Sequence, residues 1–159
     1  MRIDKESLIG KSIPKIDAAE RAAGRAIYIH DLELPRMLHA AILRTDRIHA
    51  RILSIDTSAA EQLEGVRAVI TAKDIENVPF GHGRDNTPLK GDRVRCIRDE
   101  IAAVAAETEA IAREAVGLIR VEYEDLPPVL TTEEALAEGA PLIHEKKKGN
   151  IAFTYDYSH

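Results

Sequence analysis

Six consecutive apolar residues, Ile101–Ala106, with a helix start directly behind them, set the strongest limit on the fold of this 159-residue chain. By composition the run suits either a helix or a strand, but the helix that follows at once favours a buried strand. Thr108 is a suitable N-cap. Behind it, apolar residues recur at helical spacing at Ile111, Ala115, Leu118 and Ile119. We therefore expect a strand that leads directly into an amphipathic helix.

Shorter elements are predicted on both sides of this pair. Residues 37–43 alternate with both faces largely apolar, which predicts a central strand, and further strands are expected over 51–56, 66–70 and 121–124. Capping-box spacing predicts short helices after Ser58/Glu61 and Thr131/Glu134, with Gly65 and Gly139 as stop signals, and a helical turn after Thr71/Asp74. This succession predicts an α/β (α+β) fold with one mixed sheet and three to four short helices.

Glycine and polar residues near the segment boundaries suggest that the chain has three parts. Residues 1–24 read as an extended lead-in, 25–150 as the folded domain and 151–159 as a tail. The tail alternates like a strand, and its apolar side carries Ile151, Phe153, Tyr155 and Tyr157. Together with Ile13 and Ile16 of the lead-in, these side chains are expected to form a docking face, so that the isolated domain could self-associate. The Gly- and Pro-rich segment 77–91 is expected to be a mobile loop or a contact loop for a partner.

Composition excludes several functional classes. With 22 Lys and Arg against 27 Asp and Glu, the net charge of −5 argues against a nucleic-acid module. The single cysteine, Cys96, excludes an internal disulfide and a four-cysteine metal site. No apolar run approaches the roughly 20 residues of a membrane span, and residues 1–6 lack a secretory signal. We expect a cytoplasmic protein that does not bind membranes.

No catalytic constellation assembles from the residues alone. The histidines His30, His39, His49, His82, His144 and His159 have no partner at a recognised metal-ligand spacing, so surface or strand-end positions are expected. Gly81-His82-Gly83 is half of a dinucleotide fingerprint without its third glycine. Cys96 lies between Arg95 and Arg98, which could lower its pKa, but a strand cysteine packed as a small hydrophobe is the simpler interpretation.

The clustered charges are interpreted in the same way. Glu122 and Glu124, next to Asp125, lie on the solvent side of an alternating strand, and Glu133 and Glu134 form a second acidic cluster, so solvated faces are expected for both. The lysines of 146–148 are interpreted as a solvated hinge or tail. We therefore predict no catalytic, cofactor-binding or metal-binding residue in this chain.

Five segments in order resemble a known family. They are Gly24 to Arg44, in which Gly24-Arg25-Ala26, Tyr28, Asp31, Leu38-His39-Ala40 and Arg44 carry the likeness, then His49 to Ala60, Gly65 to Ile75, Asp99 to Glu107 and Val121 to Val129. In this order and spacing the chain resembles the N-terminal α/β-hammerhead domain of the large, molybdenum-cofactor subunit of the xanthine dehydrogenase and aldehyde oxidase family. Arg98 stands where that family usually has glycine, and Cys96 where it commonly has an aromatic residue. A glycine there would allow positive φ, so Arg98 could shift the turn.

The resemblance implies a part of a larger oxidoreductase. Members hydroxylate aldehydes or N-heterocycles, or act on carbon monoxide or aromatic thioesters, with a molybdenum–pterin cofactor, iron–sulfur clusters and often FAD. Their cofactor-contacting and catalytic residues lie in later domains, so none is carried over here. The implied partners are the molybdopterin-binding domains and the iron–sulfur subunit, with no cofactor bound by this chain itself. Two alternatives stay open: an independent binding or assembly module for the molybdenum cofactor or its enzyme, and a stand-alone enzyme with an unrecognised site.

Overall fold

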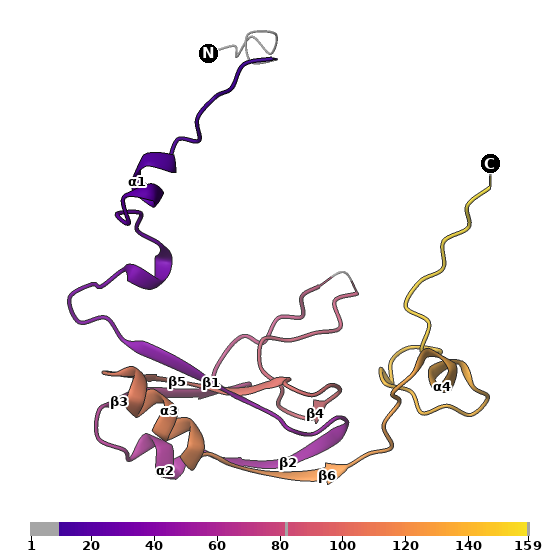
Figure 1. Ribbon diagram of the computed structural model, residues 1–159. Coiled ribbons are helices and arrows are strands. Elements are labelled where there is room, and N and C mark those ends of the chain that lie inside the picture. The colour runs from indigo at the N-terminus through magenta and orange to yellow at the C-terminus, as the bar shows by residue number, and fades with distance from the viewer. Residues whose placement is uncertain (1–9, 82, 159) are drawn as a thin grey trace. The chain divides into compact units, whose positions relative to one another are not determined.

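The computed structural model describes residues 10–81 and 83–158 (Figure 1). These residues form two compact units, which divide between Met37 and Leu38. The first unit contains helix α1, Ala18–Ala22, and a 3₁₀ turn η2, Ile29–Asp31, neither of which buries a side chain. Asp31 accepts a 2.9 Å hydrogen bond from the backbone N–H of Tyr28, and the guanidinium of Arg21 lies 5.7 Å from the centre of the Tyr28 ring. The predicted lead-in, 1–24, therefore contains helix α1, while η2 lies in the part of the first unit that follows it.

Two three-stranded sheets make up the centre of the second unit. The first has the order β1-β5-β3, with bounds His39–Arg44, Glu100–Ala106 and Val66–Thr71. The second has the order β4-β2-β6, with bounds Arg93–Val94, Ala50–Asp56 and Arg120–Asp125. Every pairing between these strands is antiparallel. The α/β fold class is confirmed, and its strands are divided between two antiparallel sheets where the sequence suggested one mixed sheet.

The apolar run Ile101–Ala106 forms most of β5, a buried strand as predicted, and β5 is the central strand of the first sheet. Its alternate side chains serve two clusters. Ala102 and Val104 pack with Ala115 of helix α3, Glu109–Leu118, while Ile101 packs with residues of the second sheet, among them Ile52. An uninterrupted apolar sequence is required because both faces of this strand contact protein at that end.

The strand predicted over 37–43 is β1, but it is not central. It lies at the edge of its sheet, and its side chains alternate between half-buried and exposed positions. Leu43 faces the core that includes α3, whereas Ile42 is 44% exposed. The prediction was wrong because an apolar face was taken to be a covered face.

Three helices follow local capping signals with different fidelity. The Thr108 hydroxyl accepts from Ile111 N–H at 3.2 Å and begins α3, and Thr131 accepts from Glu134 N–H at 3.1 Å and begins α4, Thr132–Leu136, as predicted. Helix α2, Ser58–Glu61, is capped differently: Asp56 Oδ1 accepts from the backbone and hydroxyl of Ser58, at 3.0 and 2.6 Å. The prediction that Ser58 and Glu61 form a capping box was therefore wrong, because Asp56 accepts the hydrogen bonds at the start of this helix.

The Thr71/Asp74 pair forms a single turn, in keeping with the predicted helical turn, and no longer helix follows it. Asp74 Oδ2 accepts from the Thr71 backbone at 2.7 Å and from its hydroxyl at 2.8 Å, while Asp74 N–H donates to Thr71 O at 3.1 Å. These reciprocal bonds complete one closed turn at the end of β3. The chain then continues into the irregular segment 75–92, in which Leu89 and Lys90 are buried.

Candidate functional site

The histidines do not converge within the described residues. His39 lies in β1, His30 in η2, and His144 Nε2 lies 3.7 Å from Asp85 Oδ2 in the segment that follows α4. His82 and His159 lie outside the described residues, and so does the middle of the Gly81-His82-Gly83 motif. In the part of the chain that the structure describes, no group of three His, Cys, Asp or Glu side chains is arranged to hold a metal ion.

His49 is the exception to a surface position, because it is buried at the start of β2 with 5% of its surface exposed. Its Nδ1 lies 2.8 Å from the carbonyl oxygen of Pro127, and since a carbonyl only accepts, Nδ1 carries the proton. In the neutral ring Nε2 is then an acceptor, and it is buried without a hydrogen-bond partner among the described residues. The backbone of His49 also accepts from Leu126 N–H at 2.9 Å, so this residue fastens the entry to β2 to the exit from β6.

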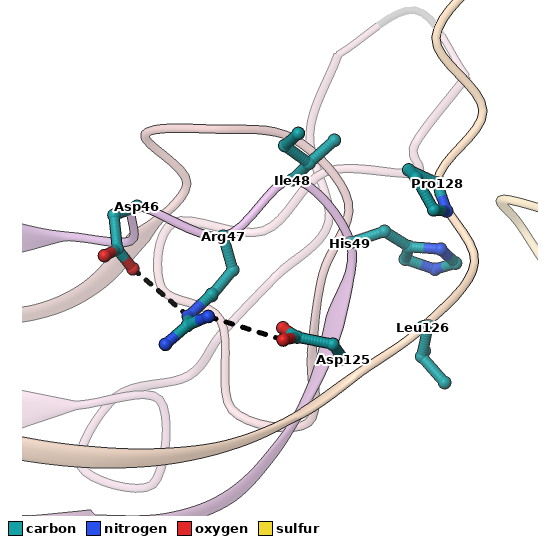
Figure 2. Close-up of a pocket in the computed structure, with 7 residues that line it drawn as sticks. All are labelled: Asp46, Arg47, Ile48, His49, Asp125, Leu126 and Pro128. Carbon is teal, nitrogen blue, oxygen red and sulfur yellow. Dashed lines mark hydrogen bonds and ion pairs between the residues drawn. The ribbon is translucent and has the colours of Figure 1, made fainter.

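His49 also lines a pocket of about 270 Å³ whose charged residues are already engaged (Figure 2). Arg47 lies between two carboxylates, with Nε 3.4 Å from Asp46 Oδ1 and an Nη 3.3 Å from Asp125 Oδ2. The single positive charge of Arg47 is therefore shared between two carboxylates. The pocket thus combines the buried His49 with a rim on which Arg47 is paired with Asp46 and Asp125.

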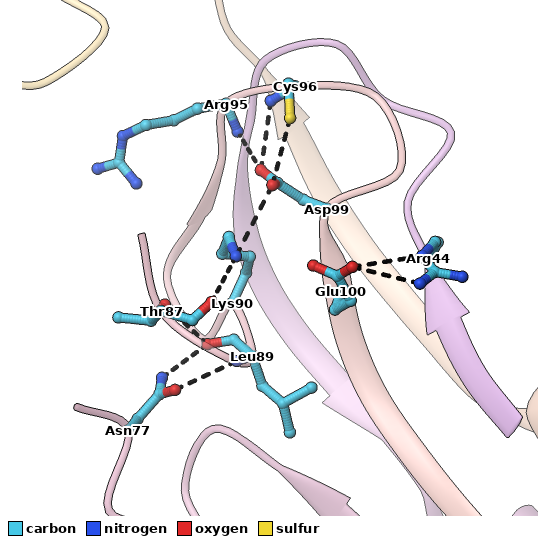
Figure 3. A network of polar contacts seen from close by, with 9 residues as sticks. All are labelled: Arg44, Asn77, Thr87, Leu89, Lys90, Arg95, Cys96, Asp99 and Glu100. Carbon is cyan, nitrogen blue, oxygen red and sulfur yellow. Dashed lines mark hydrogen bonds and ion pairs between the residues drawn. The ribbon is translucent and has the colours of Figure 1, made fainter. Parts of the chain in front are cut away.

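A buried ion pair organises the turn between β4 and β5 (Figure 3). Lys90 Nζ lies 3.7 Å from Asp99 Oδ1 and donates to the carbonyl of Thr87 at 2.7 Å. Asp99 Oδ2 accepts from the backbone N–H groups of Arg95 and Cys96, at 2.8 and 3.2 Å. Both charges therefore have several polar partners, which is the condition under which a buried pair is tolerated. The sequence did not indicate this pair, because nothing local to Lys90 signals burial.

The Asn77 side chain fixes the loop that contains Lys90 through two hydrogen bonds. The Asn77 side chain donates to the carbonyl of Leu89 at 2.6 Å and accepts from its N–H at 3.2 Å. Lys90 N–H in turn donates to Glu100 O at 2.7 Å. The final residues of the predicted loop 77–91 are thus fixed against β5, whereas the sequence suggested a segment with little to bury.

Cys96 lies in the turn after β4, exposed, and not in a strand as expected. Its thiol donates to Asp99 Oδ1 at 3.3 Å. Partial desolvation, this hydrogen bond and the negative charge of Asp99 raise the pKa of the Cys96 thiol, and the charge of Lys90 only partly offsets them. The neighbouring arginines do not produce the reactive thiolate that their proximity in sequence suggested. Cys96 is thus neither a packed strand residue nor an activated nucleophile.

Arg98 adopts the left-handed conformation that a glycine would provide, with φ of 75°. Its N–H donates to Thr45 O at 2.9 Å, and Thr45 N–H donates to Asp99 O at 2.9 Å. The turn therefore retains the positive φ expected of the resemblance even though arginine occupies the position. Because Arg98 is an L-residue with a Cβ atom, this left-handed conformation costs it free energy that glycine would not lose.

The carboxylate clusters lie on exposed faces as predicted. Glu124 pairs with Arg51 at 2.9 Å, and Glu122 accepts from Ser54 at 2.9 Å, both across β2 and β6. Glu133 has its pKa lowered by hydrogen bonds from its own backbone N–H and from Thr132. These groups are exposed residues of a strand and a helix.

A second pocket, of about 900 Å³, lies beside the segment after α4. Asn150 orders this segment: its side chain accepts from Ile143 N–H at 3.1 Å and donates to Ala135 O and Pro141 O at 3.1 and 2.9 Å. The tail beyond it, to Ser158, is extended and belongs to no strand, with Ile151 62% and Tyr157 91% exposed.

None of the described helices is long and apolar enough to cross a bilayer.

Comparisons with known proteins agree on one family. A family profile described as "Aldehyde oxidase and xanthine dehydrogenase, a/b hammerhead domain" matches residues 23–127. The "Probable hypoxanthine oxidase XdhD" of Escherichia coli strain K12 is 38% identical over 151 residues, which cover 90% of this chain and 16% of that protein. The "Nicotinate dehydrogenase large molybdopterin subunit" of Eubacterium barkeri is 39% identical over 143 residues, or 86% of this chain and 33% of that protein.

A solved structure shares the fold. The Cu,Mo-CO dehydrogenase in its carbon monoxide reduced state aligns with a TM-score of 0.80 at 33% identity, over 86% of this chain and 18% of that chain. This chain thus spans less than a fifth of that enzyme and of the Escherichia relative, and a third of the Eubacterium protein. The chain belongs to the aldehyde oxidase and xanthine dehydrogenase family, in which it corresponds to the α/β-hammerhead domain.

Proposed function

We propose that this chain serves as the structural hammerhead domain of a molybdenum hydroxylase, an oxidoreductase of the xanthine dehydrogenase and aldehyde oxidase type. It packs against the cofactor domains and the iron–sulfur partner and does not catalyse on its own. The observation that carries the proposal is the match of residues 23–127 to the hammerhead profile, which is specific to this family. A supporting observation is the amount of large apolar surface left exposed, including Ile42 and Leu53 on separate sheets.

The molybdenum–pterin cofactor would be carried by other domains. One relative is named as a large molybdopterin subunit and one neighbour as a Cu,Mo enzyme. Among the described residues, the cations at the first pocket and at the buried turn are already paired: Arg47 with Asp46 and Asp125, and Lys90 with Asp99. Iron–sulfur clusters, and FAD in members that use it, would belong to the partner domains as well. We also propose a cytoplasmic location, in keeping with a single, unpaired cysteine.

Purification of the chain from its own cells tests this function. An affinity tag on the chain, in cells grown with molybdate, is expected to bring down molybdenum and pterin together with hydroxylase activity towards aldehydes or purines, using an artificial electron acceptor. A tagged chain that purifies without molybdenum or other polypeptides would contradict the proposal. If the purified chain alone bound free pterin, the assembly-module interpretation would replace it.

A further inference from the structure

Part of one face of the sheet β1-β5-β3 is apolar and lies open to solvent. Ile42 on β1 is 44% exposed and Ile70 on β3 is 37% exposed, and Leu38, directly before β1, is 48% exposed. Ala40 and Ala68 on the same two edge strands are also exposed. This face explains why β1 has the sequence of a central strand while occupying an edge.

The strand register aligns these residues in two rows across the sheet. Ile42 pairs with Ala103, which pairs with Ile70 on the other side. One step along, Ala40 pairs with Ala105, which pairs with Ala68. We call these six residues the open face. The central strand contributes only alanines to it, so the backbone of β5 lies at the bottom of a shallow trough with an isoleucine on either side.

The opposite side of this sheet is already covered. Helices α2 and α3 lie together on one side of it (Figure 1), where Ala102, Val104 and Val69 pack with Ala115. Ile101, which alternates with Ala102, is fully buried among Ala50, Ile52 and Val94 at the other end of β5. The open face is therefore the part of the sheet beyond that cluster, not a sheet face that solvent covers throughout.

Charge defines the limits of the open face. Its six residues carry none. Arg44, at the end of β1, lies 3.4 Å from Glu100, and Arg67, near the start of β3, pairs with Glu107. Because the nearest charges satisfy each other across the strands, the surface between them has neutral, apolar complementarity and suits an uncharged partner face.

We propose that the open face is the seat of an amphipathic α-helix from the cofactor-carrying part of the enzyme, a proposal that rests on the proposed function. In the relatives this fold is 16% to 33% of the chain, so most of each protein is available to cover it. The two edge strands lie about 9.6 Å apart, twice the usual strand spacing, which is close to the roughly 10 Å diameter of a helix. A helix with small or apolar residues on one side fills this trough, with the isoleucines along its flanks.

Site-specific photo-crosslinking in the intact enzyme tests this surface. A photoreactive phenylalanine analogue is placed at Ala40 or Ala68, with Ala110 as the matched control, since all three are exposed alanines and Ala110 lies on α3. Crosslinked peptides are identified by mass spectrometry, which works whether the partner segment is on the same polypeptide or another. We expect crosslinks from positions 40 and 68 to one helical segment outside residues 1–159, and none to that segment from position 110.

Charge substitution gives an independent measurement. Ala40→Glu and Ala68→Glu would bury a carboxylate without a partner, so the molybdenum recovered with the tagged chain is expected to fall by about tenfold or more. Ala110→Glu is expected to leave it unchanged. Immunoblots of chain level and limited proteolysis establish that each variant still folds.

The outcomes separate the two proposals. If the wild-type chain brings down molybdenum but positions 40 and 68 crosslink to nothing, or only to a second copy of the chain, the open face is not the seat of the helix and the proposed function stands. Crosslinks to an extended strand instead of a helix would also overturn the inference. If the wild-type chain brings down no molybdenum, the proposed function itself fails.

Discussion

Cys96 illustrates how one carboxylate can outweigh two neighbouring cations. Arg95 and Arg98 flank the thiol in sequence, yet Arg95 directs its Nε to the carbonyl of Ile143, at 2.8 Å. Asp99, by contrast, accepts directly from the thiol at 3.3 Å. The sequence could supply the list of neighbours but not their directions, and direction determines the sign of the pKa shift.

The reactivity of Cys96 follows from that sign. Because its pKa is raised above the ordinary 9.0, the thiol is neutral at pH 7. Alkylation by iodoacetamide, followed by mass spectrometry across a pH series, is expected to show a rate midpoint above pH 9.0. In guanidinium, where Asp99 no longer faces the thiol, the midpoint should fall back. A folded-state midpoint below that of the unfolded chain would contradict the assignment.

Replacement of Arg98 by glycine is predicted to raise the free energy of unfolding. Its φ of 75° costs an L-residue roughly 1–2 kcal/mol, which glycine avoids at the expense of greater freedom in the unfolded chain. Arg98→Gly should therefore stabilise the chain by about 0.5–1 kcal/mol, measured by urea unfolding. Arg120→Gly, in a strand without positive φ, is the matched control and should destabilise it. Equal losses from both variants would show that Arg98 makes contacts that outweigh its strain.

The Asp74 side chain is predicted to contribute to the stability of the folded chain, and this contribution is lost in acid. Hydrogen bonds from the backbone and then the hydroxyl of Thr71 lower its pKa below the ordinary 3.8. A lowered folded-state pKa adds stability that is complete above the unfolded pKa and is lost as the pH falls through the folded value. Asp74→Asn should therefore be less stable than wild type at pH 6, with the gap closing as the pH falls below 3.8. A gap that widens on acidification would reverse this sign.

At the level of elements, the predicted capping signals were confirmed at Thr108 and Thr131 but not at Ser58. Thr108 and Thr131 begin helices as expected because a cap depends on only three or four consecutive residues. The edge position of β1 and the two-residue length of β4 depend on pairing with distant strands, which no local pattern encodes. Cys96 was misplaced for the same reason, since β4 ends at Val94 and the turn begins after it.

The Lys90–Asp99 pair is expected to hold the β4–β5 turn. Asp99→Ala leaves Lys90 buried and charged and two backbone N–H groups without their acceptor, so it should cost about 3 kcal/mol or more. Lys90→Met leaves Asp99 with its backbone donors and should cost less, about 1–3 kcal/mol. Chemical unfolding of both variants measures the difference. If Lys90→Met proves the more damaging, the lysine and not the carboxylate is the organising group.

At the scale of the whole molecule, the chain has two cores of modest size and much apolar surface outside them. One cluster gathers around Val104 and the other around Ile101, while large side chains such as Ile42, Leu53 and Phe153 remain largely exposed. The sequence predicted the family and the fold class, since five ordered segments are specific together. It could not predict which sheet face stays open, because that depends on what the sheet packs against.

The central claim is that this chain contributes packing and not chemistry to a molybdenum hydroxylase. Its most direct measurement is turnover of aldehydes and purines by the purified 159-residue chain, with an artificial electron acceptor and with molybdenum determined by elemental analysis, beside the enzyme that contains it. The account predicts no turnover and no stoichiometric molybdenum in the chain alone, and both in the enzyme. Reproducible turnover by the pure chain would contradict it.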